Sequence, residues 1–219
     1  DADGDIDFVM MGIDSEDNLV NYLGFKSGDK YEQVKDKYPG LIKGEVKIVD
    51  LDLDGDNDII YSGEDLNGNA SSRIITNTLL NNSNNIADIA SLKSSAIELV
   101  NTGDSTGMGI LVQGINSSGS FQSYNMGSYN LSAISEKLHS GDITAGDFNN
   151  DGYADIVLTG EDDNGTAVTK LYSAYNGTYE AFDVTLEGLR ESTAEWVDYD
   201  MDGDLDLFLM GLSDLGAKT

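Results

Sequence analysis

Aspartates recur at alternate positions in three short segments of the chain. Counted from the first acidic residue of each segment, positions 1, 3, 5 and 9 are aspartate or asparagine, and position 6 is glycine. Alternate side chains of a tightly curled loop converge, the glycine permits the bend, and residue 7 can add its backbone carbonyl. Hard oxygen ligands in this number favour calcium over magnesium or a transition metal. The predicted ligands at positions 1, 3, 5, 7 and 9 are Asp50, Asp52, Asp54, Asp56 and Asp58; Asp147, Asn149, Asp151, Tyr153 and Asp155; and Asp198, Asp200, Asp202, Asp204 and Asp206.

Two further copies of the segment are incomplete. In the first, position 1 would precede the first residue, so a partial site is predicted from Asp1, Asp3, Asp5 and Asp7. The copy that begins at Asn101 has no carboxylate at any ligand position, and we expect no calcium there. A single Asp-Gly pair is often only a turn, but three complete copies in one register favour a metal loop. Carboxylates about 4 Å apart repel by roughly 1–4 kcal/mol per pair without a cation, so the calcium is predicted to be structural.

The loops are spaced as parts of a repeat. Each copy ends in a glycine, and these glycines lie 51, 51, 46 and 51 residues apart. A leucine precedes position 1 by nine residues in four copies. Short apolar runs on both sides of each loop predict strands, and the runs after the loops, 59–61, 110–112, 156–158 and 207–209, are predicted to be buried. The glycines are Gly12, Gly63, Gly114, Gly160 and Gly211, and the leucines are Leu41, Leu92, Leu138 and Leu189.

About four strands per repeat follow when the later hairpins are added. Asn67-Gly68 and Asn164-Gly165 are dipeptides typical of tight hairpins, and β-like stretches follow them. A repeat of this length with four strands has the size of a propeller blade. The predicted fold is therefore all-β: a β-propeller, or a fragment of one, with about four four-stranded blades and a calcium loop between the first two strands of a blade. Residues 1–219 are predicted to form a single repeat region belonging to a larger ring, with approximate repeats 1–41, 42–92, 93–138, 139–189 and a partial 190–219.

The acidic loop differs at position 12 from the EF-hand, the calcium loop that joins two helices. That motif needs glutamate there, whereas this chain has Tyr61, Leu158 and Leu209. The loop resembles those of the FG-GAP/VCBS repeat family, which includes the integrin α-subunit propeller. The peptides Phe-Gly and Gly-Ala-Pro that name the family are absent, so the chain is more similar to the bacterial surface-protein branch. The resemblance implies an extracellular β-propeller with calcium in several blades, used for adhesion or ligand binding.

Composition excludes several partners. The 40 acidic residues against 12 basic ones give a formal charge of -28, which repels nucleic acid and anionic lipid surfaces. There is no cysteine, so disulfides are impossible and calcium is the expected stabilising element if the domain is secreted. No apolar run has the length needed to enter a bilayer. We expect an extracellular or cell-surface protein, of bacterial origin, that binds a protein or glycan ligand.

Catalytic machinery is not visible in the sequence. His139 is the only histidine and has no nucleophile signature beside it, so we predict a loop histidine and no enzyme. The sequence does not exclude a pair of carboxylates that cleaves glycosides, because it contains so many aspartates. Trp196 is predicted to be a core residue, and a platform for sugar binding is the second interpretation. Glu64-Asp65 and Glu161-Asp162 are predicted to lie in solvated hairpin turns. The function expected is a noncatalytic, calcium-stabilised module for adhesion, ligand binding or display. The alternative is a lectin-like or substrate-positioning propeller of a secreted carbohydrate-active enzyme.

Overall fold

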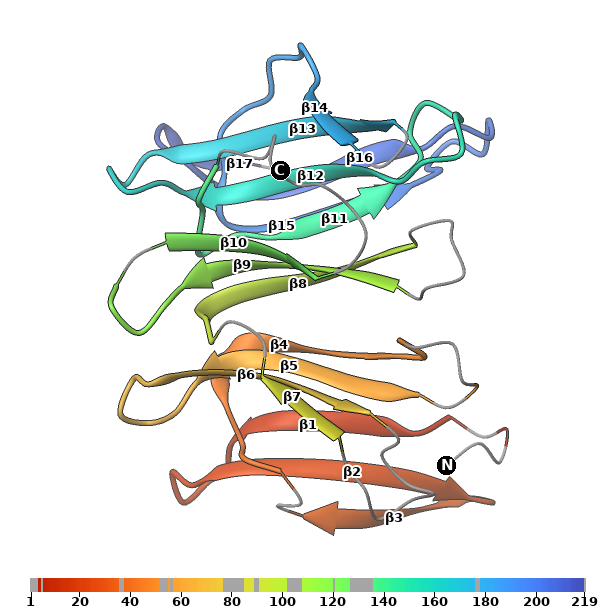
Figure 1. Ribbon diagram of the computed structural model, residues 1–219, viewed down its shortest axis with the longest axis vertical. Coiled ribbons are helices and arrows are strands. Elements are labelled where there is room, and N and C mark those ends of the chain that lie inside the picture. Colours follow the sequence, from red (N-terminus) through yellow and green to blue (C-terminus); the bar gives the residue numbers. More distant parts are fainter. Residues whose placement is uncertain are drawn as a thin grey trace. The chain divides into compact units, whose positions relative to one another are not determined.

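The described part of the chain is built from β-strands alone, which confirms the all-β prediction (Figure 1). The computed structural model describes residues 4, 6–35, 38–51, 55, 57–76, 85–88, 91–101, 108–119, 121–126, 136–175 and 178–218. Within these residues no helix is long and apolar enough to cross a membrane. The chain divides into two compact units, Asp1–Lys93 and Ser94–Thr219. The larger prediction, a single propeller region over 1–219, stays a prediction.

The first unit contains two antiparallel sheets. One consists of β1 (Phe8–Ile13), β2 (Leu19–Ser27) and β3 (Lys30–Lys35), in that order. The other consists of β4 (Ile42–Val49), β5 (Asp58–Glu64), β6 (Ala70–Thr76) and β7 (Asn85–Asp88). In both sheets each strand pairs with the next along the chain, so the sheets are simple meanders.

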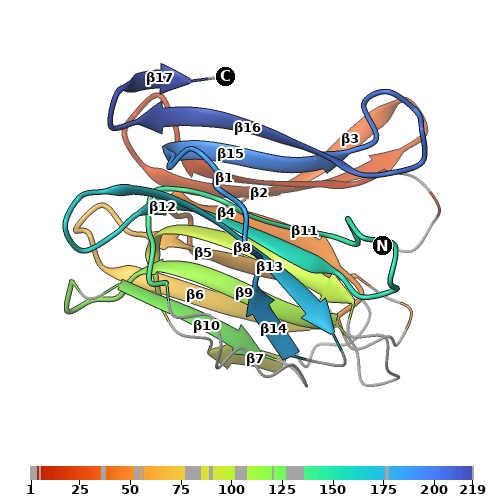
Figure 2. The same cartoon turned by 90° about the horizontal axis from the view of Figure 1, so that it is seen from above.

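Three more meanders make up the second unit. They are the sheets β8 (Lys93–Asn101), β9 (Met108–Ile115) and β10 (Phe121–Met126); β11 (Ile143–Gly146), β12 (Asp155–Glu161), β13 (Ala167–Tyr175) and β14 (Thr178–Ala181); and β15 (Arg190–Val197), β16 (Asp206–Ser213) and β17 (Gly216–Lys218). Figure 2 shows the strands of the β11–β14 sheet running side by side. The three complete acidic loops lead into the second strands β5, β12 and β16, and the partial first copy leads into β1.

Second strands are buried on both faces where sheets pack against each other. Ile156, Val157 and Leu158 of β12 are 0%, 0% and 2% exposed. Successive side chains of a strand point to opposite faces, so a continuous apolar run fits a strand that is covered on both sides. Ile156 and Leu158 lie in a cluster with Leu111 of β9, and Val157 lies in a cluster with Ala194 of β15. The predicted buried runs at 59–61, 110–112 and 156–158 are confirmed.

The run at 207–209 differs from this prediction. Phe208 of β16 is 49% exposed, whereas Leu207 and Leu209 on the other face pack against the cluster of Val157. The sequence pattern is the same as in the other repeats, but only one face of this sheet is covered in the described residues. The prediction of a fully buried strand was therefore wrong for β16.

The repeat leucine and glycine have a steric role. All four leucines are at most 5% exposed, and two residues after each one the backbone has a positive φ of 44° to 52°. This bend brings the first strand against the glycine of the second strand: a Cβ on Gly63 would lie 2.8 Å from the carbonyl oxygen of Ile42, and one on Gly160 would lie 2.6 Å from that of His139. A side chain does not fit there. The residues with positive φ are Lys43, Ser94, Ser140 and Glu191.

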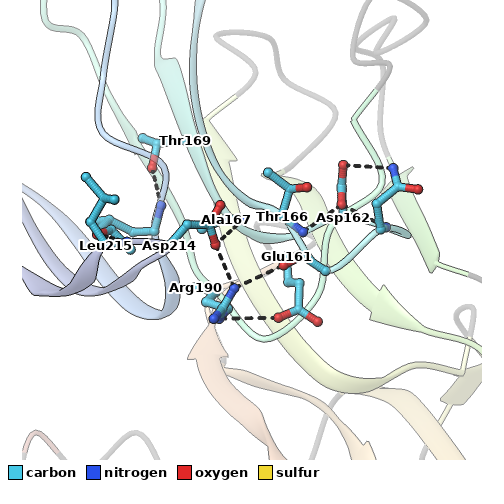
Figure 3. A network of polar contacts seen from close by, with 12 residues as sticks. Glu161, Asp162, Thr166, Ala167, Thr169, Arg190, Asp214 and Leu215 are labelled. Carbon is cyan, nitrogen blue, oxygen red and sulfur yellow. Dashed lines mark hydrogen bonds and ion pairs between the residues drawn. The ribbon is translucent and has the colours of Figure 1, made fainter.

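A cation follows the repeat leucine at two places and holds the preceding hairpin. Lys93 lies 3.9 Å from the Glu64 carboxylate and donates a hydrogen bond of 3.2 Å to the carbonyl of Gly68. Arg190 repeats both contacts. It lies 3.4 Å from the Glu161 carboxylate (Figure 3), and it donates a hydrogen bond of 3.0 Å to the carbonyl of Gly165. Arg190 also donates to Asp214 at 2.9 Å.

These contacts correct the prediction for the two glutamates. Glu64 and Glu161 close the strands β5 and β12 instead of lying in solvated turns, and Glu64 is only 5% exposed. The neighbouring aspartates do form exposed turns. Asp162 accepts backbone hydrogen bonds from Asn164 and Thr166 at 2.8 and 2.9 Å, and these bonds, that from Thr166 first, lower the pKa of Asp162.

Candidate metal site

The loop between β15 and β16 brings three aspartates together. One carboxylate oxygen each from Asp198, Asp200 and Asp206 lies within 4.8 Å of the others. These residues occupy positions 1, 3 and 9 of the predicted loop. Three carboxylates at this separation repel one another in the absence of a cation, and their oxygens are ligands of the type that calcium prefers.

Backbone amides shape this loop. Asp198 accepts hydrogen bonds from the amides of Asp202 and Gly203, both at 3.1 Å, and Asp200 accepts one from Asp202 at 3.2 Å. Asp206 closes the loop by accepting from the amide of Tyr199 at 3.0 Å. Gly203 has a φ of +96°, a conformation that glycine adopts at little cost. The sequence thus folds locally into a curl that aims alternate side chains inward.

The loop between β11 and β12 has the same contacts with a different ligand set. Asp147 accepts from the amides of Asp151 and Gly152 at 2.9 and 2.8 Å, and Asn149 accepts from Asp151 at 3.0 Å. The amide of Tyr153 donates to Asp151 at 3.0 Å, as that of Asp204 does to Asp202 in the other loop. Two loops with different sequences therefore share one hydrogen-bonding scheme, in which the side chains at the predicted ligand positions accept the hydrogen bonds.

Asp155, the first residue of β12, joins its loop to the sheet through hydrogen bonds. Its side chain is fully buried and accepts from the amide of Phe148 at 3.2 Å and from that of Ala174 in β13 at 2.7 Å. Burial raises the pKa of Asp155, and the nearby charge of Asp151 adds to this effect. A buried carboxylate beside other acids is a costly arrangement, and a bound cation would reverse the shift.

The loop that precedes β5 is described only in part. Asp52, Asp54 and Asp56 lie outside the described residues. At the described positions the contacts match those of the other loops: Asp50 accepts from the amide of Gly55 at 3.0 Å, and the buried Asp58 accepts from that of Leu51 at 2.9 Å.

The two incomplete copies are also described in part. Asp1, Asp3 and Asp5 lie outside the described residues, as do residues 102–107 of the copy without carboxylates. Asp7 accepts from the amide of Lys26 at 2.9 Å, the counterpart of the contact between Asp155 and Ala174. Position 9 of the first copy therefore makes the same contact with the following strand as Asp155 does, and the absence of calcium from the copy at Asn101 stays a prediction.

A contact between two loops was not predicted. The side-chain amide of Asn150 donates to the carboxylate of Asp204 at 2.8 Å. Asn150 is at position 4, which is not a ligand position, and Asp204 is at position 7, where the backbone carbonyl is the expected ligand. The alignment of ligands carried no signal for this bond, because neither of the two side chains that it joins is a predicted ligand.

Trp196 and His139 are held by neighbouring side chains. The Trp196 ring stacks on Phe148 at 5.7 Å with an angle of 4°, and Gly146 leaves room for it, since a Cβ there would lie 2.7 Å from the indole. Trp196 thus packs against the hydrophobic cluster of Val157, as predicted for a core residue. His139 pairs its backbone with Glu161 and its ring with Ser140 at 2.6 Å. Burial lowers the pKa of His139, while the charge of Glu161 opposes this.

Comparison with known proteins finds one relation. Residues 147–209 match the family model of the FG-GAP-like repeat. No curated protein and no solved structure matches the chain. The matched segment begins at the first ligand of one acidic loop and contains all of the next loop, so it covers one full repeat and the two loops that flank it. On this match, the segment from Asp147 to Leu209 belongs to the FG-GAP-like repeat family.

Proposed function

We propose that the chain is a calcium-stabilised, noncatalytic β-propeller module that binds or displays a ligand outside the cell. The observation that carries the proposal is the convergence of Asp198, Asp200 and Asp206 in a loop whose backbone holds them in place. The same hydrogen-bonding scheme in the loop of Asp147 supports a second site. Calcium would be held by the carboxylates and by the position 7 carbonyls, in three complete loops and one partial loop.

Electrostatics supports a structural role for the metal. The formal charge of -28 opposes compaction, and much of it lies in the loops. In a metal-free loop, each carboxylate pair about 4 Å apart costs roughly 1–4 kcal/mol, depending on the local dielectric. Calcium that binds only the folded loop removes this cost and adds its binding free energy to the free energy of unfolding.

The ligand is proposed to be a protein or a glycan at the surface of a bacterial cell. The membership of residues 147–209 in the FG-GAP-like repeat family supports an integrin-like propeller used in binding. One observation keeps a lectin-like role as the second candidate. An open hollow of about 650 Å³ in the first unit is lined by Tyr38, Pro39, Asp65 and Asn69, which place polar groups beside a largely buried tyrosine ring. A glycan array tests this role, and binding that is lost in a folded Asn69→Ala variant would favour it, because Asn69 lines the hollow and is exposed.

Thermal unfolding tests the structural calcium. The melting temperature is measured in EDTA, in excess calcium and in excess magnesium. We expect a fall of many degrees in EDTA, recovery on adding calcium, and much less recovery with magnesium, which retains its waters and demands octahedral geometry. The same melting curve in EDTA and in calcium would refute the proposal.

A further inference from the structure

Two complete acidic loops of the second unit are joined by a polar bridge. They are 147–155, here called the upstream loop, and 198–206, the downstream loop. The side-chain amide of Asn150 donates to the carboxylate of Asp204 at 2.8 Å. Asn150 is at position 4 of the upstream loop, between two predicted ligands, and Asp204 is at position 7 of the downstream loop, where its backbone carbonyl is the predicted ligand. The bridge therefore joins the backbones that carry two sets of metal ligands.

An apolar contact joins the same two loops. Phe148, at position 2 of the upstream loop, donates its amide to Asp155 at 3.2 Å, and its ring stacks on Trp196 at 5.7 Å. Trp196 lies two residues before the downstream loop. A Cβ on Gly146, directly before the upstream loop, would lie 2.9 Å from the side chain of Leu205, at position 8 of the downstream loop. Such close packing lets neither loop change its backbone independently of the other.

The polar bridge acts on a residue whose backbone shapes the upstream loop. Asn150 has a φ of +58°, and Met201, at the same position of the downstream loop, has a φ of +61°. This left-handed conformation has an energetic cost for residues other than glycine, and asparagine tolerates it well. When the downstream loop holds calcium, the backbone of Asp204 is ordered as a ligand, and the acceptor for Asn150 is ordered with it. The upstream loop then loses less conformational freedom when it binds its own ion.

Charge acts in the same direction. The carboxylate of Asp204 is not a predicted ligand, so its negative charge faces the upstream loop whether or not the downstream loop is filled. Repulsion between two bound cations opposes this attraction. Both Asn150 and Asp204 are exposed, and salt and water screen such repulsion in exposed loops.

We propose that the upstream and downstream loops bind calcium cooperatively, through the bridge between Asn150 and Asp204. This inference rests on the proposed function, since it requires that both loops bind calcium. Coupling between two sites is reciprocal, so each filled loop should raise the affinity of the other by the same factor. The two sheets that carry the loops would then be stabilised together, over one narrow range of calcium concentration.

Isothermal titration of the full chain with calcium measures this coupling. Asp50→Asn, which removes position 1 of the remaining complete loop, gives the reference protein. Adding Asp198→Asn leaves the upstream loop alone, and adding Asp147→Asn leaves the downstream loop alone; the partial first loop is present in all three. The coupling factor is the product of the two binding constants of the reference divided by the product of the two single-loop constants. We expect a factor of about five, at the low end of typical coupling between sites, because the bridge is exposed.

Variants of the bridge assign the coupling to it. Asn150→Gly keeps the left-handed backbone and removes the amide, so the factor should fall to about one. Asp204→Ala should do the same, and the two changes together should do no more, because they act through one bond. Met201→Gly is the matched control, since it places glycine at the same position of the downstream loop and should leave the coupling intact.

The outcomes separate this inference from the proposed function. Near-ultraviolet circular dichroism reports the fold of every variant. Two ions that bind the reference independently, or a coupling factor that Asn150→Gly leaves unchanged, would overturn the inference while calcium binding still stands. A reference protein that binds no calcium would overturn both.

Discussion

Substitution of Asp155 by asparagine distinguishes calcium-dependent stability from the packing of the loop. The asparagine has nearly the same shape but only one acceptor oxygen, whereas Asp155 accepts from both Phe148 and Ala174. One amide would then face the asparagine NH₂ group, and losing a hydrogen bond to a charged group costs about 1.5–3 kcal/mol. In the metal-free protein this loss is partly offset, because burial raises the pKa of Asp155 and its charged form is already costly there.

Calcium adds a separate loss. If Asp155 closes the metal loop, the variant forfeits the linkage free energy of one site, which is about 2.7 kcal/mol at a calcium concentration about 100 times the Kd. The effect of Asp155→Asn on the free energy of unfolding should therefore be larger in calcium than in EDTA by about this amount. A purely structural aspartate would give the same effect in both conditions.

Urea unfolding with and without calcium measures the difference. Asp183→Asn removes one charge from an exposed position outside the loops and serves as the matched control. It should change the free energy of unfolding by less than about 0.5 kcal/mol in either condition. Equal losses for Asp155→Asn in EDTA and in saturating calcium would refute the assignment of Asp155 as a ligand.

Three further predictions concern the repeat framework. Gly63→Ala should lower the free energy of unfolding by about 1–3 kcal/mol, because its Cβ would meet the backbone of the first strand. Gly12→Ala, at the same repeat position with open space around it, should change this free energy by less than about 0.5 kcal/mol. Denaturant unfolding compares the two variants, and equal losses would contradict the steric account. Arg190→Ala should cost about 1–2 kcal/mol by removing the contacts with Glu161 and the hairpin, and Arg190→Lys less than that, because lysine serves at the equivalent position; equal effects of the two changes would argue against the clamp. His139→Gln tests the pKa: since burial lowers the pKa of His139 in the folded state, the wild type should lose stability relative to the variant as the pH falls below about 6.5, and a relative gain on acidification would reverse the sign.

Much of the framework follows from local pattern. Apolar runs after each loop predicted the second strands, and the Asn-Gly pairs predicted the hairpins after β5 and β12, because periodicity and turn chemistry are properties of neighbouring residues. The glycine spacing also predicted where the loops lie. The physical reason for glycine at Gly63 and Gly160 is the close approach of the first strand. Local pattern did not predict this approach, because the contacting atoms come from residues about 20 positions away.

The misread residues have partners that local pattern does not reveal. Glu64 and Glu161 precede turn dipeptides, so they read as turn residues, but each contacts a cation that follows the next repeat leucine, 29 residues downstream. Glu64 also lies 2.5 Å from Lys43, 21 residues upstream. Phe208 has the pattern of a buried strand, but burial depends on whether another sheet covers that face. The bond between Asn150 and Asp204 joins residues 54 positions apart. Each of these features depends on which elements meet in space.

The number of calcium ions bound is the most direct test of the central claim. Isothermal titration of the metal-free chain with calcium should give a stoichiometry of three, or four if the partial first loop also binds. The triple variant Asp50→Asn, Asp147→Asn and Asp198→Asn removes position 1 from every complete loop and should lose these three ions. No binding by the wild type at millimolar calcium, or an unchanged stoichiometry in the folded triple variant, would contradict the account.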